Sequence, residues 1–302
     1  MVSKALSRLR PDKSMGPDGL SPKLLMEVND LIAYPLLLLF NKSLSESSVP
    51  QDWKQATITP IFKQGNRNAV ENYRPVSLTS QICKIFESII RDAIVQHLES
   101  QLLIKNTQHG FRKGRSCLTN LLEFLDKVTG CVDSGDNVDV IFLDFAKAFD
   151  KVSHVKLVSK LKAHGIEGNI LDWIKEWLHQ RVQRVSIRGI ISDWISVLSG
   201  VPQGSVLGPV LFLIFINDLD FGIKSWILKF ADDTKIFNRV SGKADVDKLQ
   251  EDLHRLVRWS EEWQMLFNVS KCKVMHVGSL HFERQYFMND QRLEVVTQEK
   301  DL

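Results

Sequence analysis

The segment that most constrains this chain is WILKFADDTKIFNRV, residues 226–240, in which two apolar runs flank a short polar centre. β-branched and aromatic residues on both sides favour strands, so we expect a β-hairpin with Asp232 and Asp233 at its tip. Neighbouring carboxylates in an apolar setting repel each other and lose hydration unless a cation or hydrogen-bond donors compensate them. A divalent metal such as Mg²⁺ or Mn²⁺ is the economical explanation, although adjacent aspartates at a turn are more often simply solvated.

The length and composition are those of a globular protein. The chain has 302 residues, of which 44% are hydrophobic and 25% are charged, so it can bury a sizeable core. The net charge of +3 hides an asymmetry, because basic residues outnumber acidic ones in residues 1–120 and acidic residues outnumber basic ones afterwards. This distribution suits a polyanion held near a metal site, but chance and solvated helix faces would produce it too.

The cysteines and the apolar segments argue against a secreted or a membrane protein. The 4 cysteines lie far apart without a C-x-x-C pair, so neither a disulfide framework nor a zinc finger is indicated. We therefore expect reduced, intracellular thiols. No signal peptide opens the chain, and the most apolar segments, residues 31–40 and 210–216, are too short to span a bilayer. The sequence predicts a soluble protein with no membrane partner.

Strand-like and helix-like segments alternate along the chain and predict an α/β or α+β body with a helical, basic N-terminal part. Pro22 follows a serine as the first residue of a helix that we expect to continue to about Ser45, with an interruption near Pro35. Residues 53–62 have strand composition, and Pro60 places that strand at an edge or near its end. Residues 138–143 form a nearly continuous apolar run, which predicts a strand buried on both faces.

Asp144 follows that buried strand, and it completes a possible set of three carboxylates. If the strand is a neighbour of the hairpin in one sheet, Asp144, Asp232 and Asp233 converge at one edge. Such a cluster can hold two Mg²⁺ ions about 3.5–4 Å apart, which activate an attacking hydroxyl and stabilise a pyrophosphate leaving group. From the residues alone, a carboxylate that caps a turn at the end of a strand is an equally good interpretation of Asp144.

Several segments, taken together and in order, carry a family resemblance. VDVIFLDFAKAFDKVSH, SGVPQGSVLGPVLFLIFINDL and KFADDTKIF strongly resemble motifs A, B and C of reverse transcriptases, specifically those of LINE-type, jockey-like non-LTR retrotransposons. DKSMGPDGLSPKLL, WKQATITPIFKQGNRNAVENYRPVSLTS and QHGFRKGRSCLTNLL resemble the N-terminal, fingers and pre-palm motifs of the same group. The pattern extends through FNVSKCKVMHVG and covers nearly the whole chain, so chance is not a serious rival.

The resemblance implies the α+β, right-hand polymerase fold with fingers and palm. We expect fingers and an N-terminal extension in residues 1–135. We expect a palm with motifs A to D in residues 136–302, built on an antiparallel sheet backed by helices. The sequence stops where the family continues into the thumb, and it does not include the endonuclease that precedes the polymerase in such elements. The sequence therefore predicts a thumb-less fragment with weak or absent processivity.

The resemblance also assigns catalytic residues and metal ligands. Asp144, Asp232 and Asp233 would bind the metal ions together with the backbone carbonyl of Phe145. Lys271 would be the motif D lysine proposed to protonate pyrophosphate, on a looser alignment. The first two positions of the usual Y-x-D-D box are Phe and Ala here, which is common in this branch.

A second group of residues is implied to bind the nucleotide. Lys63 and Arg74 match the fingers cations that hold the triphosphate. The lysine would act as a point charge, and the guanidinium group of the arginine would donate two hydrogen bonds side by side. Phe149 occupies the steric-gate position, which implies deoxynucleotide substrates. The alternative is core packing, and both roles can hold at once. Gln203 resembles the motif B residue that contacts the incoming nucleotide and template. Gly204 would let the backbone approach closely.

The template would meet Arg112, Lys113 and Arg115, whose contacts with its backbone position it without reading its sequence. The implied function is RNA-directed DNA synthesis with two Mg²⁺ ions, or Mn²⁺. Its partners are an RNA template, a DNA primer or target, and deoxynucleoside triphosphates, in the nucleus or cytoplasm. The sequence leaves the oligomeric state open. The first alternative is a nucleic-acid-binding remnant without catalysis. The second is a group II intron maturase or telomerase-like enzyme, which the residues of QHGFRKGRSC and SGVPQGSVLGP disfavour.

Overall fold

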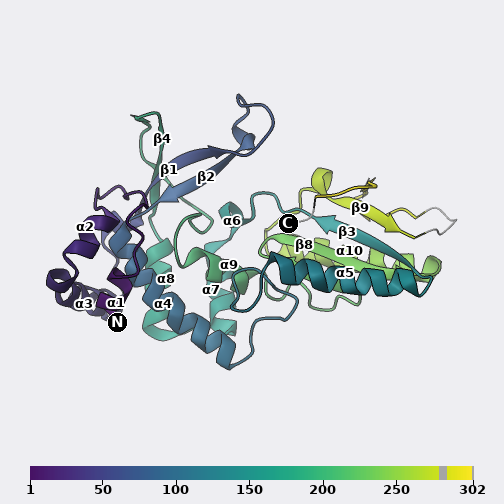
Figure 1. The fold of residues 1–302 in the computed structure, drawn as a ribbon, viewed down its shortest axis with the longest axis horizontal. Helices are drawn as coiled ribbons and strands as arrows, with labels where there is room; N and C mark the ends of the chain where they lie inside the picture. The colour runs from purple at the N-terminus through teal and green to yellow at the C-terminus, as the bar shows by residue number, and fades with distance from the viewer. Residues whose placement is uncertain (279–283, 301–302) are drawn as a thin grey trace. The chain divides into compact units, whose positions relative to one another are not determined.

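The computed structural model describes residues 1–278 and 284–300, and the chain divides into two compact units. The first unit comprises Met1–Leu103 and His154–Ile214. The second comprises Ile104–Ser153 and the described residues after the first unit ends. Each unit is therefore assembled from two separate stretches of the chain, and the labels in Figure 1 identify the elements of both.

The first unit consists of a group of packed helices and a small mixed sheet. The sheet has the order β2-β1-β4-β5, with β6 also paired to β4; β1 and β2 are antiparallel, whereas β1 and β4 are parallel. The elements are α1 (Val2–Leu6), α2 (Pro22–Glu27), α3 (Asn29–Ser45), η1 (Gln51–Lys54), β1 (Gln55–Phe62), η2 (Val70–Asn72), β2 (Tyr73–Leu78), α4 (Gln81–Ser100), α7 (His154–Ala163), α8 (Gly168–Leu178), β4 (Val182–Ile187), β5 (Ile190–Ile191), β6 (Ile195–Ser196) and most of α9 (Gly208–Phe215).

Aromatic side chains hold the helices of this unit together. The ring of Phe86 on α4 stacks on Phe40 of α3 with 4.7 Å between centroids and meets Trp173 of α8 edge-on at 5.0 Å. The Trp173 indole N–H donates to Ser43 Oγ at 2.9 Å, so its polar atom is satisfied although the ring is fully buried. Helix α4 begins where Ser80 Oγ accepts the N–H of the third residue beyond it, as an N-cap does.

Two proline predictions have different outcomes. The expected interruption near Pro35 was wrong, because Pro35 lies inside α3 and the helical segment breaks instead at Val28, between α2 and α3. A proline removes one backbone hydrogen bond, and the helix continues on both sides of that loss. Of the two positions expected for Pro60, the one near the end of the strand is confirmed. β1 lies between β2 and β4 and is not an edge strand, but β4 pairs with it only along Gln55–Ile58 and leaves β2 as the neighbour at Pro60.

The second unit is built on a larger sheet with the order β12-β9-β3-β8-β7. Its elements are α5 (Cys117–Asp133), β3 (Asn137–Leu143), α6 (Ala148–Lys151), β7 (Trp226–Phe230), β8 (Asp233–Val240), α10 (Lys243–Glu262), η3 (Val269–Lys271), β9 (Lys273–Val277), β10 (Phe287–Met288), β11 (Gln291–Arg292) and β12 (Glu294–Val295). Strands β9, β3, β8 and β7 are antiparallel neighbours, as predicted, but β12 joins β9 in parallel. The sheet is therefore mixed, and the fold is α+β with mixed sheets.

Helices cover this sheet, as the run of residues 138–143 predicted. One apolar cluster joins Val128 of α5 to Val138 and Val140 of β3, Leu228 of β7 and Phe237 of β8. Successive side chains on a strand point to opposite faces of the sheet. The successive residues in the middle of β3 are nevertheless all buried, so both faces of the sheet are covered at this strand. Helix α10 packs against β8, and Figure 1 shows α5 lying lengthwise beside the same strands.

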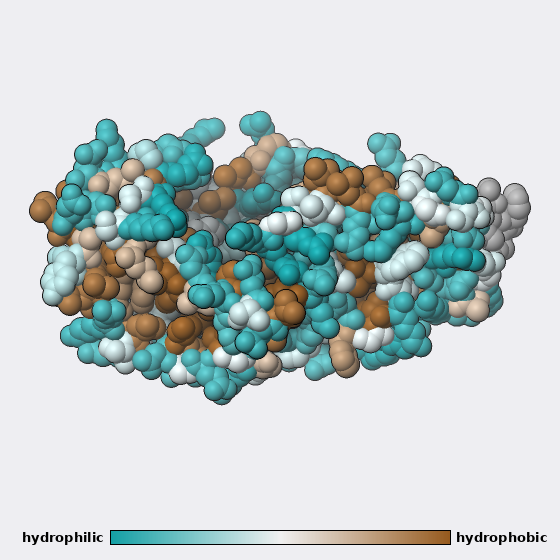
Figure 2. All heavy atoms as spheres, turned by 60° about the horizontal axis from the view of Figure 1, so that its bottom comes forward, coloured by the Kyte–Doolittle hydropathy of each residue, from teal (hydrophilic) through white to brown (hydrophobic). Residues whose placement is uncertain are grey.

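The surface is mixed in character. Figure 2 shows apolar side chains among polar ones, including some over the part of the first unit where Figure 1 places α1 to α3. Leu31, Tyr34 and Leu38 of α3 are among the exposed apolar residues there. No helix within residues 1–278 and 284–300 is long and apolar enough to cross a membrane.

Candidate active site

The register of β3, β8 and β7 brings the predicted metal ligands to one end of the sheet. Leu143, the last residue of β3, pairs with Thr234 near the start of β8, so Asp144 leaves the sheet beside that start. Phe230 pairs with Asp233, which leaves only Ala231 and Asp232 in the hairpin loop. The condition that the buried strand and the hairpin be neighbours is thus met by direct pairing.

Asp144 is partly exposed and lies next to Lys271, the predicted proton donor. The Lys271 ammonium nitrogen is 3.4 Å from Asp144 Oδ2, with 68% of the lysine side chain exposed. The Asn268 N–H donates to the Asp144 carbonyl oxygen at 2.7 Å, which ties the end of β3 to the segment before η3. Beneath them, burial raises the pKa of Cys272 to about 11, so this thiol stays protonated at neutral pH.

The donor chemistry of the three aspartates fits a divalent cation, because hard carboxylate oxygens are the ligands that Mg²⁺ and Mn²⁺ prefer. Within residues 1–278 and 284–300, no three Asp, Glu, His or Cys side chains stand close enough together, as placed, to hold a metal ion. The structure brings the backbone positions of Asp144, Asp232 and Asp233 together, and their coordination of metal stays a prediction.

Two phenylalanines near Asp144 have clear structural partners. The ring of Phe145 is buried and stacks on Phe267 with 4.4 Å between centroids, which anchors the residue that follows Asp144. Phe149, the predicted steric gate, lies on the short helix α6 and meets the ring of Phe111 edge-on at 6.5 Å. Helix α6 begins after Lys147, whose φ of 57° turns the chain sharply between the two phenylalanines.

The predicted triphosphate cations lie at one end of the β1–β2 hairpin, in the first unit. Lys63 follows β1, and its backbone N–H donates to the carbonyl of Asn72 at 2.9 Å. Arg74 lies on β2 opposite Ile61. Both cations are exposed, as a role in binding a ligand from solvent requires, and that role stays a prediction.

Gln203 and Gly204 are locked to the same hairpin through backbone contacts. The Gln203 carbonyl accepts the Ser77 N–H at 2.7 Å. Gly204 has a φ of +125°, and a Cβ built there would lie 2.4 Å from the Ser77 carbonyl oxygen. We expected glycine here because the backbone must approach another group closely. In the structure that group is the backbone of β2 in the same chain.

The loop that carries the predicted template contacts is held by side chains. Arg112 Nη1 donates to the Lys105 carbonyl at 2.8 Å, and Arg115 Nη1 lies 3.6 Å from Glu123 Oε2. The fully buried His109 bonds Glu123 as well, and burial, reinforced by the Arg115 charge, lowers the pKa of His109. Lys113 is exposed.

Sequence reasoning missed Glu87, which supports the motif B turn. Glu87 Oε2 accepts the N–H groups of Val206 at 2.6 Å and Leu207 at 3.2 Å, just before α9 begins. Its side chain is 1% exposed. The available signal was a carboxylate on the apolar face of α4, four residues after Cys83 and three before Ile90. Gln108, which contacts the hairpin of Asp232, was missed as well.

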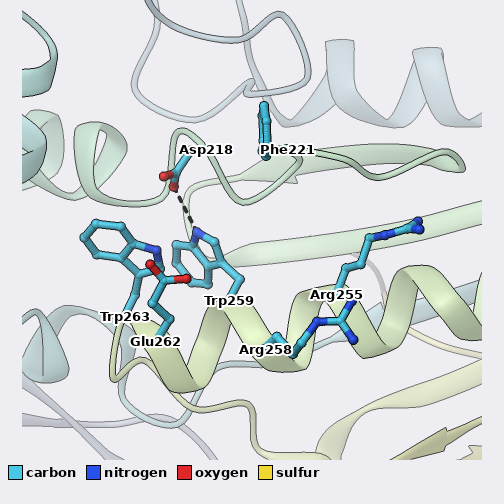
Figure 3. Close-up of a pocket in the computed structure, with 7 residues that line it drawn as sticks. All are labelled: Asp218, Phe221, Arg255, Arg258, Trp259, Glu262 and Trp263. Carbon is cyan, nitrogen blue, oxygen red and sulfur yellow. Dashed lines mark hydrogen bonds between the residues drawn. The ribbon is translucent and has the colours of Figure 1, made fainter.

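A separate pocket of about 330 Å³ lies in the second unit, between the segment after α9 and one face of α10 (Figure 3). None of the predicted site residues lines it; its walls are Asp218, Phe221, Arg255, Arg258, Trp259, Glu262 and Trp263. The Trp259 indole N–H donates to Asp218 Oδ1 at 2.9 Å, and Arg255 Nη1 is bound to Asp252 at 2.7 Å. Two carboxylates and two guanidinium groups balance in this pocket, so its charge favours no single class of ligand.

Comparison with known proteins gives the family. Residues 61–298 match the sequence model of the reverse transcriptase (RNA-dependent DNA polymerase) family. The chain is 31% identical over 277 residues to the probable RNA-directed DNA polymerase from transposon X-element of Drosophila melanogaster, covering 89% of this chain and 30% of that protein. It is 30% identical over 281 residues to the RNA-directed DNA polymerases from mobile element jockey of D. melanogaster and D. funebris, covering 90% of this chain and 31% of each.

The chain thus spans about 30% of the length of these relatives. The matched region contains the β3–β8 strand pair with its three aspartates, and it contains Lys63, Arg74 and β2, but only the last two residues of β1. The chain belongs to the reverse transcriptase family and is related to the polymerases of the jockey and X-element non-LTR retrotransposons.

Proposed function

We propose that this chain carries the catalytic centre of an RNA-directed DNA polymerase of a non-LTR retrotransposon. The observation that supports it best is the pairing of Leu143 with Thr234, which sets Asp144 beside Asp232 and Asp233 within a reverse transcriptase domain. In this proposal residues 1–135 supply the fingers and residues 136–302 the palm.

The proposed reaction is attack of a primer 3′-hydroxyl on the α-phosphorus of a deoxynucleoside triphosphate, with loss of pyrophosphate. Asp144, Asp232, Asp233 and the carbonyl of Phe145 would hold two Mg²⁺ ions, which supply charge neutralisation when bound. Lys271, beside Asp144, is suited to donate a proton to the departing pyrophosphate.

The remaining residues bind and orient the substrates. Lys63 and Arg74 hold the triphosphate, and Phe149 excludes a 2′-hydroxyl beneath the sugar. The motif B turn at Gln203 and Gly204 contacts the base pair being formed. The basic loop with Arg112, Lys113 and Arg115 follows the phosphates of an RNA template, so the partners are RNA, a DNA primer and deoxynucleotides. Because such a primer is a nicked chromosome in this family, the proposed site of action includes the nucleus.

The test is extension of an oligo(dT) primer on poly(rA) with Mg²⁺. We expect incorporation by the natural chain and a loss of at least about 100-fold with Asp232→Asn, which keeps the shape of the side chain but removes its charge. Asp247→Asn, at an exposed aspartate on α10, is the matched control and should retain activity. Template binding without incorporation by the natural chain would contradict the proposal and favour a nucleic-acid-binding role without catalysis.

A further inference from the structure

The residue before Asp232 adopts a conformation that its side chain disfavours. Ala231 is buried and has a φ of 56°, in the left-handed region. In that region the Cβ of an L-residue crowds the following carbonyl oxygen, so an alanine held there costs free energy that a glycine would not. Because Ala231 and Asp232 make up the whole hairpin loop, relaxation of Ala231 would redirect the Asp232 carboxylate.

One side chain holds Ala231 in place from outside the hairpin. Gln108 Oε1 accepts the Ala231 N–H at 2.9 Å, and Gln108 Nε2 lies 3.4 Å from the Ala231 carbonyl oxygen. The same Oε1 accepts the Gly110 N–H at 2.8 Å, so both lone pairs of the amide oxygen are used. Gln108 is only 2% exposed, so water cannot easily replace these bonds.

The backbone around Gln108 is itself fixed to the hairpin. The Lys229 N–H donates to the Thr107 carbonyl, and the His109 N–H donates to the Lys229 carbonyl, both at 2.8 Å. These bonds flank a single parallel bridge between Gln108 and Lys229 of β7. Gly110 then passes so close that a Cβ built on it would lie 2.4 Å from the Ala231 nitrogen. The backbone bonds on both sides of Gln108 therefore fix the position from which its side chain reaches Ala231.

We propose that Gln108 is a positioning residue that holds the strained Ala231–Asp232 peptide, and so aims the Asp232 carboxylate at the metal site. This inference rests on the proposed function in assigning a metal ligand to Asp232. Gln108 itself is not proposed to touch metal, nucleotide or template. Gln108 acts by holding the backbone of Ala231. This can be tested with glycine at position 231, because glycine adopts the same φ without the steric free-energy cost that alanine has there.

The experiment compares the natural chain with Gln108→Leu, Ala231→Gly and the double variant. Leucine matches glutamine in size but leaves the two N–H groups without acceptors. Gln108→Asn, which withdraws the amide by one methylene, provides a milder second change if the leucine variant does not fold. Gln291→Ala, at an exposed glutamine of the same unit, is the matched control.

The first measurement is amide hydrogen exchange at Ala231, which needs neither metal nor activity. We expect exchange at least about tenfold faster in Gln108→Leu, or in Gln108→Asn, and unchanged exchange in Gln291→Ala. Unchanged exchange in the folded Gln108 variants would overturn the inference whatever the polymerase assay shows.

The second measurement is the affinity for Mn²⁺, followed by the paramagnetic resonance signal of the free ion, with primer extension beside it. We expect Gln108→Leu to bind Mn²⁺ about tenfold more weakly and to lower kcat, with little change in KM for the deoxynucleotide. Adding Ala231→Gly should recover most of both losses. A double variant no better than Gln108→Leu would overturn the inference, because a glutamine that contacted substrate directly could not be rescued by relaxing Ala231. Failure of the natural chain to extend a primer would count against the proposed function and leave the exchange result intact.

Discussion

Replacing Glu87 by alanine should lower the free energy of unfolding of the first unit by about 2–6 kcal/mol. Glu87 Oε2 accepts the N–H groups of Val206 and Leu207, and the side chain is 1% exposed. Truncation removes the acceptor of both donors in a place that solvent does not reach. Each buried donor left without a partner costs about 1–3 kcal/mol, and two of them give the range stated.

A second consequence of the Glu87 substitution concerns charge. Arg181 is 2% exposed, and burial lowers the pKa of its guanidinium, while the negative charge of Glu87 opposes that shift. Removing Glu87 leaves this buried cation with less compensation, so the loss should lie in the upper part of the range. The milder substitution Glu87→Gln keeps a side-chain oxygen able to accept both N–H groups and should cost about 1 kcal/mol.

The assay is urea unfolding followed by tryptophan fluorescence, since Trp173 and Trp177 are buried in the same unit. Glu99→Ala, at an exposed glutamate on the same helix, is the matched control and should change the unfolding free energy by less than about 0.5 kcal/mol. Glu87→Ala within about 0.5 kcal/mol of the natural chain would refute the reasoning, because it would mean that the two N–H groups find other partners at no cost.

Three further predictions concern backbone space, pH and a surface ion pair. Gly204→Ala should destabilise the first unit by more than about 2 kcal/mol in urea unfolding, because its Cβ would meet a backbone oxygen at 2.4 Å. Gly130→Ala lies inside α5 with open space around its Cβ, and it should instead stabilise the second unit by about 0.5–1 kcal/mol. Burial lowers the pKa of His154 below 6.5, so the unfolded chain takes up a proton first and stability should fall as the pH drops below 6.5; His154→Gln should show less of that fall, and an identical pH profile would contradict the assignment. Lys271→Met should shift the unfolding free energy by less than about 1 kcal/mol, since its pair with Asp144 is exposed, while lowering the rate of primer extension; a large loss of stability would contradict this description.

The local patterns of the chain were sufficient for much of the fold. Alternation and apolar runs correctly predicted the buried strand β3 and the β7–β8 hairpin, and proline chemistry correctly placed Pro60 near the end of a strand, because each depends on neighbouring residues in the sequence. The interruption near Pro35 was predicted wrongly, because helical propensity is a weak guide to where a long apolar helix breaks. The parallel strand β12 had no signal, since two residues are too few to show a period.

The chemistry proposed for the candidate site was inferred from residue identities and from the order of the motifs, above all from the aspartates and the glycine of the motif B turn. The contacts that support these residues became visible only in the folded chain. Glu87 meets a backbone N–H 119 residues away, and Gln108 meets the Ala231 backbone 123 residues away. A side chain that bonds to a backbone group requires no particular side chain on its partner, so such contacts leave no pattern in the sequence. The pairing of Leu143 with Thr234 is likewise a matter of strand register, which is fixed when the sheet buries its faces and not by either residue alone.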